Sequence, residues 1–163
     1  MRNTFAEVFY ELAKENDKLI LVVADISPAG AINKFRNEFP DRFINTGVAE
    51  QIMIGMCAGM SLRGLRPWAY TIAAFALYRP YEFIRNDICY QKQPVTIVGI
   101  WGYKELGSSH YAIEDIAVAK TLPGLKIISP WNVQEVAEAT RYCSTQTESP
   151  IYLRLYKLNL DLP

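Results

Sequence analysis

Apolar and polar positions along the chain follow two periodicities, one typical of strands and one typical of helices. The runs Leu19–Ala24 (LILVVA) and Val95–Ile100 (VTIVGI) are almost entirely apolar, as strands are when both faces of a parallel sheet are covered. Shorter runs of the same kind recur along the chain. We expect six strands, at Leu19–Ala24, Arg42–Thr46, Trp68–Ile72, Val95–Ile100, Lys126–Ser129 and Ile151–Leu155.

Segments with a helical spacing of apolar residues fill the intervals between these strands. Thr4 with Glu7 forms a capping-box pattern, in which two side chains pair with free amide groups where a helix starts, and Asn132 with Glu135 offers a second cap. Gly64 suits the position just after a helix. We expect a helix starting at Thr4, helices at Ile32–Phe39, Ala49–Arg63, Ala74–Tyr90 and Ile113–Leu122, and one from Asn132 to about Thr145.

Strands that alternate with helices indicate one α/β domain over residues 1–163, with a mainly parallel sheet and helices on both faces. A chain of 163 residues has the size of one ordinary domain. Ligands of such folds bind at the carboxyl ends of the strands. The loops that follow Ala24, Thr46, Ile72 and Ile100 are therefore the expected location of a functional site.

Composition narrows the classes of function. The 17 Lys+Arg residues balance 17 Asp+Glu residues, so net charge gives no basis for binding nucleic acid or an anionic membrane. The longest uncharged central run, residues 67–78, is too short to span a membrane, and the N-terminus does not resemble a secretory signal. Three cysteines without CxxC spacing indicate neither a disulfide framework nor a zinc site. We expect a soluble, cytoplasmic protein, whose 12% aromatic content leaves some rings for an interface.

Common nucleotide-binding and hydrolase motifs do not occur in the sequence. No GxGxxG follows the first strand, and neither GxxxxGK[ST] nor GxSxG is found. The chain contains one histidine, so a hydrolase triad has a single possible base.

Three of the loops carry other candidate chemistry. Asp25 directly follows the first strand; an acid there faces a ligand or, more often, caps a loop or the next helix. Glu50 begins an apolar helix, where it either complements the helix dipole or, shielded from water, exchanges a proton with a bound ring. His110 is either a solvated or packed loop residue or a hydrogen-bond partner of a reacting oxygen. Taken singly, the residues leave these alternatives open.

Three motifs follow one another along the chain: FINTGVAEQIMIGM, then WAYTIAAFALYRPYEF, then SSHYAIEDIA. In this order they resemble the pyrimidine-binding domain of transketolases, over about residues 1 to 157. The similarity is in particular to the carboxy-terminal chains of split transketolases and to 1-deoxyxylulose-5-phosphate synthase. It implies the pyrimidine type of the thiamine diphosphate-binding fold.

The resemblance implies a role for each candidate residue. Glu50 matches the catalytic glutamate that hydrogen-bonds N1′ of the aminopyrimidine of thiamine diphosphate, favouring the imino tautomer that removes the thiazolium C2 proton. Phe75 matches the aromatic residue that stacks on the pyrimidine ring, and Tyr78 a second aromatic in the same pocket, although core packing is the alternative for either ring. Asp25 matches an acid near the thiazolium, and His110 the catalytic histidine that contacts the donor substrate.

Several positions depart from the family pattern. Leu106 replaces an acid that helps to recognise a sugar-donor hydroxyl, and Ala29 replaces a serine that contacts the substrate phosphate. Trp101 and Tyr103 make the loop after the fourth strand more aromatic than the family's histidine-bearing version. We therefore hypothesise a substrate that is less phosphorylated, more apolar or nucleotide-linked than an ordinary sugar phosphate.

The sequence contains no GDG, the motif with which the family binds the cofactor's diphosphate and Mg²⁺ on a separate domain. The resemblance therefore implies a separate GDG-bearing subunit that supplies the Mg²⁺ site, in an α2β2 heterotetramer, and no third family domain within these residues. Together the chains would transfer a two-carbon ketol or acyl unit between carbonyl or sugar substrates. A non-catalytic regulatory subunit of the same fold is the alternative, and a ligand-binding α/β module unrelated to thiamine is a third hypothesis.

Overall fold

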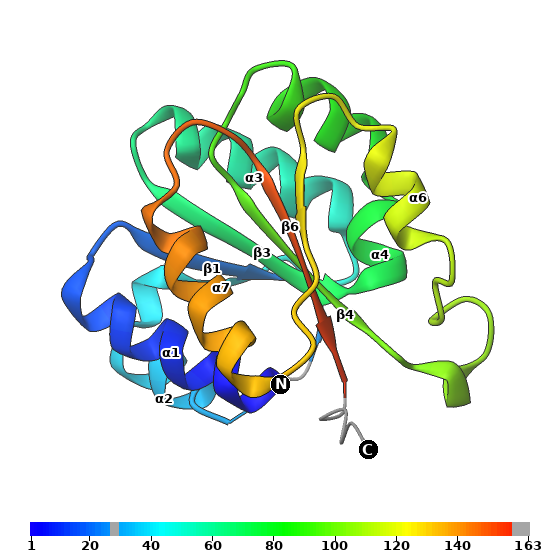
Figure 1. Ribbon diagram of the computed structural model, residues 1–163. Helices are drawn as coiled ribbons and strands as arrows, with labels where there is room; N and C mark the ends of the chain where they lie inside the picture. Colours follow the sequence, from blue (N-terminus) through cyan, green and yellow to red (C-terminus); the bar gives the residue numbers. More distant parts are fainter. Residues whose placement is uncertain (27–29, 158–163) are drawn as a thin grey trace.

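A six-stranded, entirely parallel sheet forms the centre of the molecule in the computed structural model, which describes residues 1–26 and 30–157 (Figure 1). The strands are β1 (Leu19–Val23), β2 (Phe43–Asn45), β3 (Arg66–Ile72), β4 (Thr96–Trp101), β5 (Lys126–Ile128) and β6 (Ile151–Tyr156). Their order across the sheet is β2-β1-β3-β4-β6-β5, and every neighbouring pair is parallel. The predicted α/β class with a mainly parallel sheet is confirmed.

Helices cover both faces of the sheet (Figure 1). One layer holds α1 (Arg2–Glu15), α2 (Ile32–Glu38) and α7 (Val133–Thr145); the other holds α3 (Glu50–Leu62), α4 (Ala73–Leu77), α5 (Tyr81–Phe83), the π-helix η2 (Ile84–Cys89) and α6 (Asp115–Lys120). The 3-10 turns η1 (Pro40–Arg42) and η3 (Lys104–Leu106) lie in loops. No helix in the described part of the chain is both long and apolar enough to cross a membrane.

Successive side chains of a strand point to opposite faces of the sheet and enter two separate apolar cores. On β1, Leu19, Leu21 and Val23 belong to the core shared with α1, α2 and α7. Ile20 and Val22 belong to the core shared with α3 and α4. Because both faces are covered, the run LILVVA has no polar position.

Aromatic rings fill much of the first core. Rings on α1, α2 and β3 contact one another at centroid distances of 5.1 to 5.8 Å: Phe5, Phe9, Phe35, Trp68 and Tyr70. All five side chains are buried. These rings therefore account for part of the high aromatic content without any interface.

The segment predicted as one helix, Ala74–Tyr90, is divided into three pieces. α4 ends at Leu77, and Pro80 precedes the single turn of α5. Proline has no N–H to donate and its ring clashes with the preceding turn, so a continuous α-helix is broken here. Beyond α5 the chain winds into the wider π-helix η2. The prediction of a single helix is wrong, and the break leaves Arg79 between two helical pieces.

The two predicted caps have different outcomes. At the start of α7, Asn132 Oδ1 accepts a hydrogen bond from the Glu135 N–H over 2.8 Å, as expected for a capping box. α1, in contrast, begins at Arg2 with Met1 at its N-cap, so Thr4 lies within the first turn and provides no cap. Met1 is buried in the first core, and this packing extends the helix beyond its predicted start.

The order of the strands places a topological switch point beside β1. From β1 the chain moves to β2 at the edge and then returns to β3 on the other side of β1. The loops that leave β1 and β3 therefore diverge, which is where open parallel sheets bind ligands. Asp25 follows β1, Glu50 starts the helix after β2, and Phe75 lies on the helix after β3.

Candidate active site

A cavity of about 290 Å³ lies at the carboxyl ends of β1 and β3. Among its lining residues are the predicted Asp25, Glu50, Phe75 and His110, which the fold brings together from four separate segments. The other lining residues are Ala24, Ile26, Val48, Thr71, Ile72 and Arg79. The site predicted from the carboxyl ends of the strands therefore corresponds to a real cavity.

Glu50 is only 2% exposed, which is unusual for a carboxylate. It is the first residue of α3, so its charge lies at the positive end of the helix dipole. Its Oε1 and Oε2 accept hydrogen bonds from Nη1 of Arg79 over 2.9 and 3.1 Å. This pairing satisfies a charge that would otherwise be costly to bury.

The guanidinium of Arg79 also covers one aromatic wall of the cavity. Its central carbon lies 3.9 Å from the centroid of the Phe75 ring, within the range of a cation–π contact. The ring of Phe75 in turn meets the imidazole of His110 edge to face, with centroids 4.9 Å apart and planes at 70°. Glu50, Arg79, Phe75 and His110 thus form one continuous line of contacts through the cavity.

Sequence reasoning missed Arg79, although two signals pointed to it. Arg79 is the first charged residue after the uncharged run 67–78, and it follows Phe75 by four positions, a spacing that places two side chains on one helical face. A carboxylate expected to be shielded from water also requires a positive partner.

Asn45, at the end of β2, ties together the two loops that carry the acids. Its Oδ1 accepts hydrogen bonds from the backbone N–H groups of Asp25 and Gly47, each over 3.0 Å. Asp25 adopts a φ of 45°, in the left-handed region that non-glycine residues rarely occupy. Such backbone strain is typical of functional sites, and the Asn45 amide helps to hold it here.

The loop that carries His110 is fixed at both ends. Nδ1 of His110 lies 2.9 Å from Oγ of Ser109, and the indole N–H of Trp101 donates to the carbonyl of Ala112. Beyond the loop, Asp115 is fully buried at the start of α6. The imidazole is therefore presented to the cavity from an anchored segment.

Asp115 is held by two strand residues. Its Oδ2 accepts hydrogen bonds from Nε of Arg154 over 2.7 Å and from the hydroxyl of Tyr152 over 2.8 Å. Arg154 is almost completely buried as well, so this is an interior ion pair. Removing either partner would leave an unpaired interior charge, which makes the pair an anchor for α6 and the preceding loop.

Tyr78 lies apart from the other predicted site residues and does not line the cavity. Partial burial, followed by the negative charges of Glu114 and Asp115, raises the pKa of Tyr78 to about 12. Its hydroxyl therefore faces the start of α6. A contact of Tyr78 with a cofactor stays a prediction.

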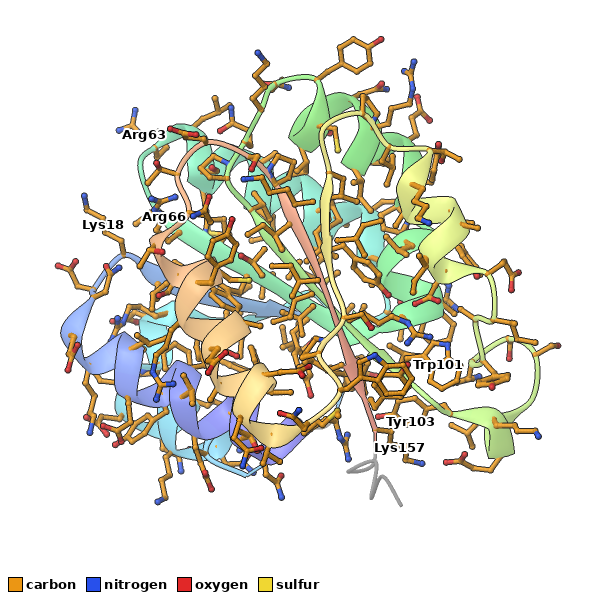
Figure 2. All side chains as sticks on the ribbon, in the orientation of Figure 1. Lys18, Arg63, Arg66, Trp101, Tyr103 and Lys157 are labelled. Carbon is orange, nitrogen blue, oxygen red and sulfur yellow. The ribbon has the colours of Figure 1, made fainter. Side chains whose placement is uncertain are left out.

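The aromatic residues expected to shape a substrate pocket do not reach the cavity either. The Trp101 ring packs on Tyr156 at 5.2 Å, and the Tyr103 hydroxyl accepts a hydrogen bond from Nη1 of Arg2 over 3.0 Å. Figure 2 shows Trp101 and Tyr103 beside Lys157, near the end of β6. Their packing gives no support to the substrate hypothesis. Leu106 is exposed in η3, and Ala29 lies outside the described residues.

A larger cavity, of about 510 Å³, lies at the opposite edge of the sheet, near the amino ends of β4, β5 and β6. It is lined by Cys89, Tyr90, Lys92, Pro123, Gly124, Glu148, Ser149 and Pro150. None of the predicted site residues contributes to it. Since parallel sheets bind ligands at their carboxyl ends, the smaller cavity is the better candidate.

The smaller cavity combines a shielded carboxylate, an aromatic face and an imidazole. A carboxylate exchanges protons with a ring nitrogen, an aromatic face stacks on a planar heterocycle, and an imidazole hydrogen-bonds an oxygen near neutral pH. Within residues 1–26 and 30–157, no three His, Cys, Asp or Glu side chains gather into a group that would hold a metal ion. The site is therefore built to hold and protonate an aromatic ring.

Comparison with known proteins agrees with this description. The profile of the family described as "Transketolase, pyrimidine binding domain" matches residues 1–163. A 1-deoxy-D-xylulose-5-phosphate synthase of Clostridium perfringens is 34% identical over 93% of the chain and 25% of its own length. One of the subunits of the apulose-4-phosphate transketolase of Actinobacillus succinogenes is 32% identical over 95% of the chain and 50% of its own length.

A solved structure described as a split gene transketolase, inactive β4 tetramer, is 35% identical and superimposes with a TM-score of 0.88. The match covers 99% of this chain and 52% of that chain. The present chain thus spans about half the length of such split proteins and a quarter of the synthase. Fold, motifs and family profile agree over its whole length, and the chain belongs to the transketolase family, as a pyrimidine-binding domain.

Proposed function

We propose that the chain is the pyrimidine-binding part of a split, thiamine diphosphate-dependent transferase that moves a two-carbon ketol or acyl unit between carbonyl compounds. The observation that carries the proposal is the carboxylate of Glu50, which is 2% exposed and lies in one cavity with Phe75 and His110. Few other functions require a buried acid opposite an aromatic face at this edge of a parallel sheet.

The cavity fits one ring of the cofactor and not the whole of it. An apolar cavity of about 150 Å³ accepts benzene, so the 290 Å³ present here suits a substituted pyrimidine and leaves no room for a diphosphate. The Glu50 carboxylate would hold a proton shared with N1′, and Phe75 would support the face of the ring. When bound, thiamine diphosphate supplies the thiazolium that stabilises a carbanion.

The other cavity residues act around that ring. His110, whose position is fixed by its anchored loop, would donate or accept a hydrogen bond at a substrate oxygen. Asp25 lies on the opposite loop and would place negative charge near the cationic thiazolium. Ile26, Val48 and Ile72 line the same space and would exclude water from the Glu50 carboxyl group.

A partner with a GDG motif completes the proposal, because this chain would bind neither the diphosphate nor Mg²⁺. Apolar side chains at the rim of the cavity support such a partner: Val48 is 71% exposed, and Ile52 and Met56 are also exposed along the outer face of α3. Large exposed apolar groups beside a site are typical of an interface. We infer an α2β2 assembly, in line with relatives described as one chain of a transketolase with several subunits and as an inactive β4 tetramer.

The test is to express the chain together with a GDG-bearing transketolase subunit and to compare the wild type with Glu50→Gln. We expect a stable complex that binds thiamine diphosphate only with Mg²⁺. Glu50→Gln should form the same complex but lose about 10²–10⁴-fold in turnover, the usual range for removing an acid–base group.

Glu11→Gln is the matched control, because Glu11 is an exposed carboxylate that pairs with Lys14 on α1, away from the cavity. It should not change turnover. Undiminished turnover by Glu50→Gln contradicts the assigned role of this acid. Tight binding of the cofactor by the isolated chain contradicts the division of the site between two subunits.

A further inference from the structure

Arg79 makes the two contacts that the proposed function assigns to the pyrimidine ring. Its Nη1 donates to both oxygens of Glu50, at 2.9 and 3.1 Å, and its planar guanidinium lies 3.9 Å from the centroid of Phe75. A pyrimidine ring that shares a proton with Glu50 and stacks on Phe75 needs the same acid and the same aromatic neighbour. The guanidinium and the ring therefore compete for the same two residues.

We propose that Arg79 stands in for the cofactor's ring in the cofactor-free protein and leaves when the ring enters. This inference rests on the proposed function, because it assumes which ligand displaces the guanidinium. Cofactor binding is then an exchange, in which one planar hydrogen-bond donor on Glu50 replaces another.

The burial of the two partners explains why such a stand-in is needed. Glu50 is 2% exposed on its side chain, whereas the side chain of Arg79 is 41% exposed. An interior carboxylate without a partner is strongly unfavourable, so an empty site needs a substitute cation. A half-exposed arginine can move its charged head into water at little cost, because its long stem is flexible.

The position of Arg79 in the chain suits this movement. Arg79 lies between the end of α4 at Leu77 and the start of α5 at Tyr81, where Pro80 interrupts the helix. Phe75, in contrast, lies within α4, and Glu50 within α3. The mobile partner is therefore attached at a break, and the two residues that receive the ring are attached to helices.

The exchange weakens cofactor binding, since the competent form of the site is only the fraction in which Arg79 has left. Removing the guanidinium should therefore tighten binding. A structural ion pair that persists in the loaded site predicts the opposite, because its loss would disturb Glu50 and weaken binding. The sign of the change in Kd distinguishes the two.

The experiment titrates thiamine diphosphate with Mg²⁺ into the complex with the GDG-bearing subunit and measures Kd by calorimetry. We expect Arg79→Met, which keeps the length of the side chain, to bind about tenfold more tightly than the wild type. Arg79→Lys keeps the charge but loses the planar contact with Phe75 and should fall between them. It also serves as the second variant if Arg79→Met fails to fold.

Arg36→Met is the matched control, because the Arg36 guanidinium lies 5.9 Å from the Phe43 ring on the opposite face of the sheet. Its Kd should equal that of the wild type. If the wild type binds and Arg79→Met and Arg79→Lys bind equally or more weakly, the exchange is overturned while the proposed function stands. If the wild-type complex binds no cofactor at all, the proposed function fails and the exchange fails with it.

Discussion

Gly99, in the middle of β4, shows how a single residue determines the geometry behind the site. It lies beside Tyr152 of β6, whose hydroxyl donates to the buried Asp115 at the start of α6. A Cβ atom at position 99 would come within 2.6 Å of the Tyr152 ring and hydroxyl. Only glycine therefore allows this ring to pass over β4 and reach the acid.

Gly99→Ala should accordingly lower the free energy of unfolding by about 1–3 kcal/mol, the usual cost of overpacking an interior. The measurement is urea denaturation of the purified chain. Gly59→Ala is the control: Gly59 lies in α3 with no atom within 4 Å of an added Cβ, so alanine there should leave stability unchanged or raise it by about 0.5–1 kcal/mol. Equal stability of Gly99→Ala and wild type would show that Tyr152 can move aside freely.

At this scale, the sequence predicted which acids, which aromatic ring and which histidine share the cavity, but it did not predict Arg79. The roles of Glu50, Phe75 and His110 follow from motifs of fixed spacing, which survive in the linear sequence. The contact between Arg79 and Glu50 joins residues 29 positions apart, and it depends on a helix break that tertiary packing decides.

At the scale of elements, α7 has the strongest start signal of the chain. Asn132 accepts the Glu135 N–H over 2.8 Å, and the Glu135 carboxylate accepts the N–H of Trp131 over 2.8 Å. Both side chains thus satisfy backbone donors that the helix itself leaves free.

Asn132→Ala should therefore lower the free energy of unfolding by about 1 kcal/mol. Thr4→Ala, at the cap that was predicted for α1 and does not form, should leave stability nearly unchanged. Thermal melts of the two variants beside the wild type are a direct comparison. A similar loss for both would mean that capping is not the cause.

Strands were easier to predict than helices, for a physical reason. Burial on both faces makes an interior strand continuously apolar, and this pattern is visible in the sequence of β1 and β4. The break at Pro80 and the π-helix after it depend on packing against α3 and on the loss of one backbone donor. The capping pattern at Thr4 failed because burial of Met1 outweighed it.

For the whole molecule, the outer face of α3 is the surface that decides assembly in our proposal. Ile52 is 58% exposed and lies in the first turn of α3, close to the cavity rim. Aspartate at this position adds a charge that the helix dipole favours, so the fold should tolerate it. A buried interface would not tolerate the same charge.

Ile52→Asp should therefore keep the stability of the isolated chain but abolish the complex with the GDG-bearing subunit, as measured by sedimentation velocity. Tyr142→Asp is the control, since Tyr142 is a large exposed side chain on α7, in the layer on the opposite face of the sheet. This control should assemble normally. Assembly of Ile52→Asp at wild-type affinity would place the partner elsewhere.

The alternation of strands and helices predicted a parallel sheet, but not the order β2-β1-β3-β4-β6-β5. Strand order depends on which edges meet in three dimensions, and local patterns carry no record of it. The switch point beside β1, and with it the site, could be located only once that order was known.

The place of β6 in this order also constrains how the protein is made. β6 is the last of the six strands along the chain, yet it lies between β4 and β5 and joins them. While the ribosome has not yet released residues 151–156, β5 has no strand to pair with and β4 presents an open edge. Unpaired parallel edges are prone to aggregation during synthesis. A nascent chain that stalls at this point should therefore depend on chaperones, and completion of β6 closes both edges in one step.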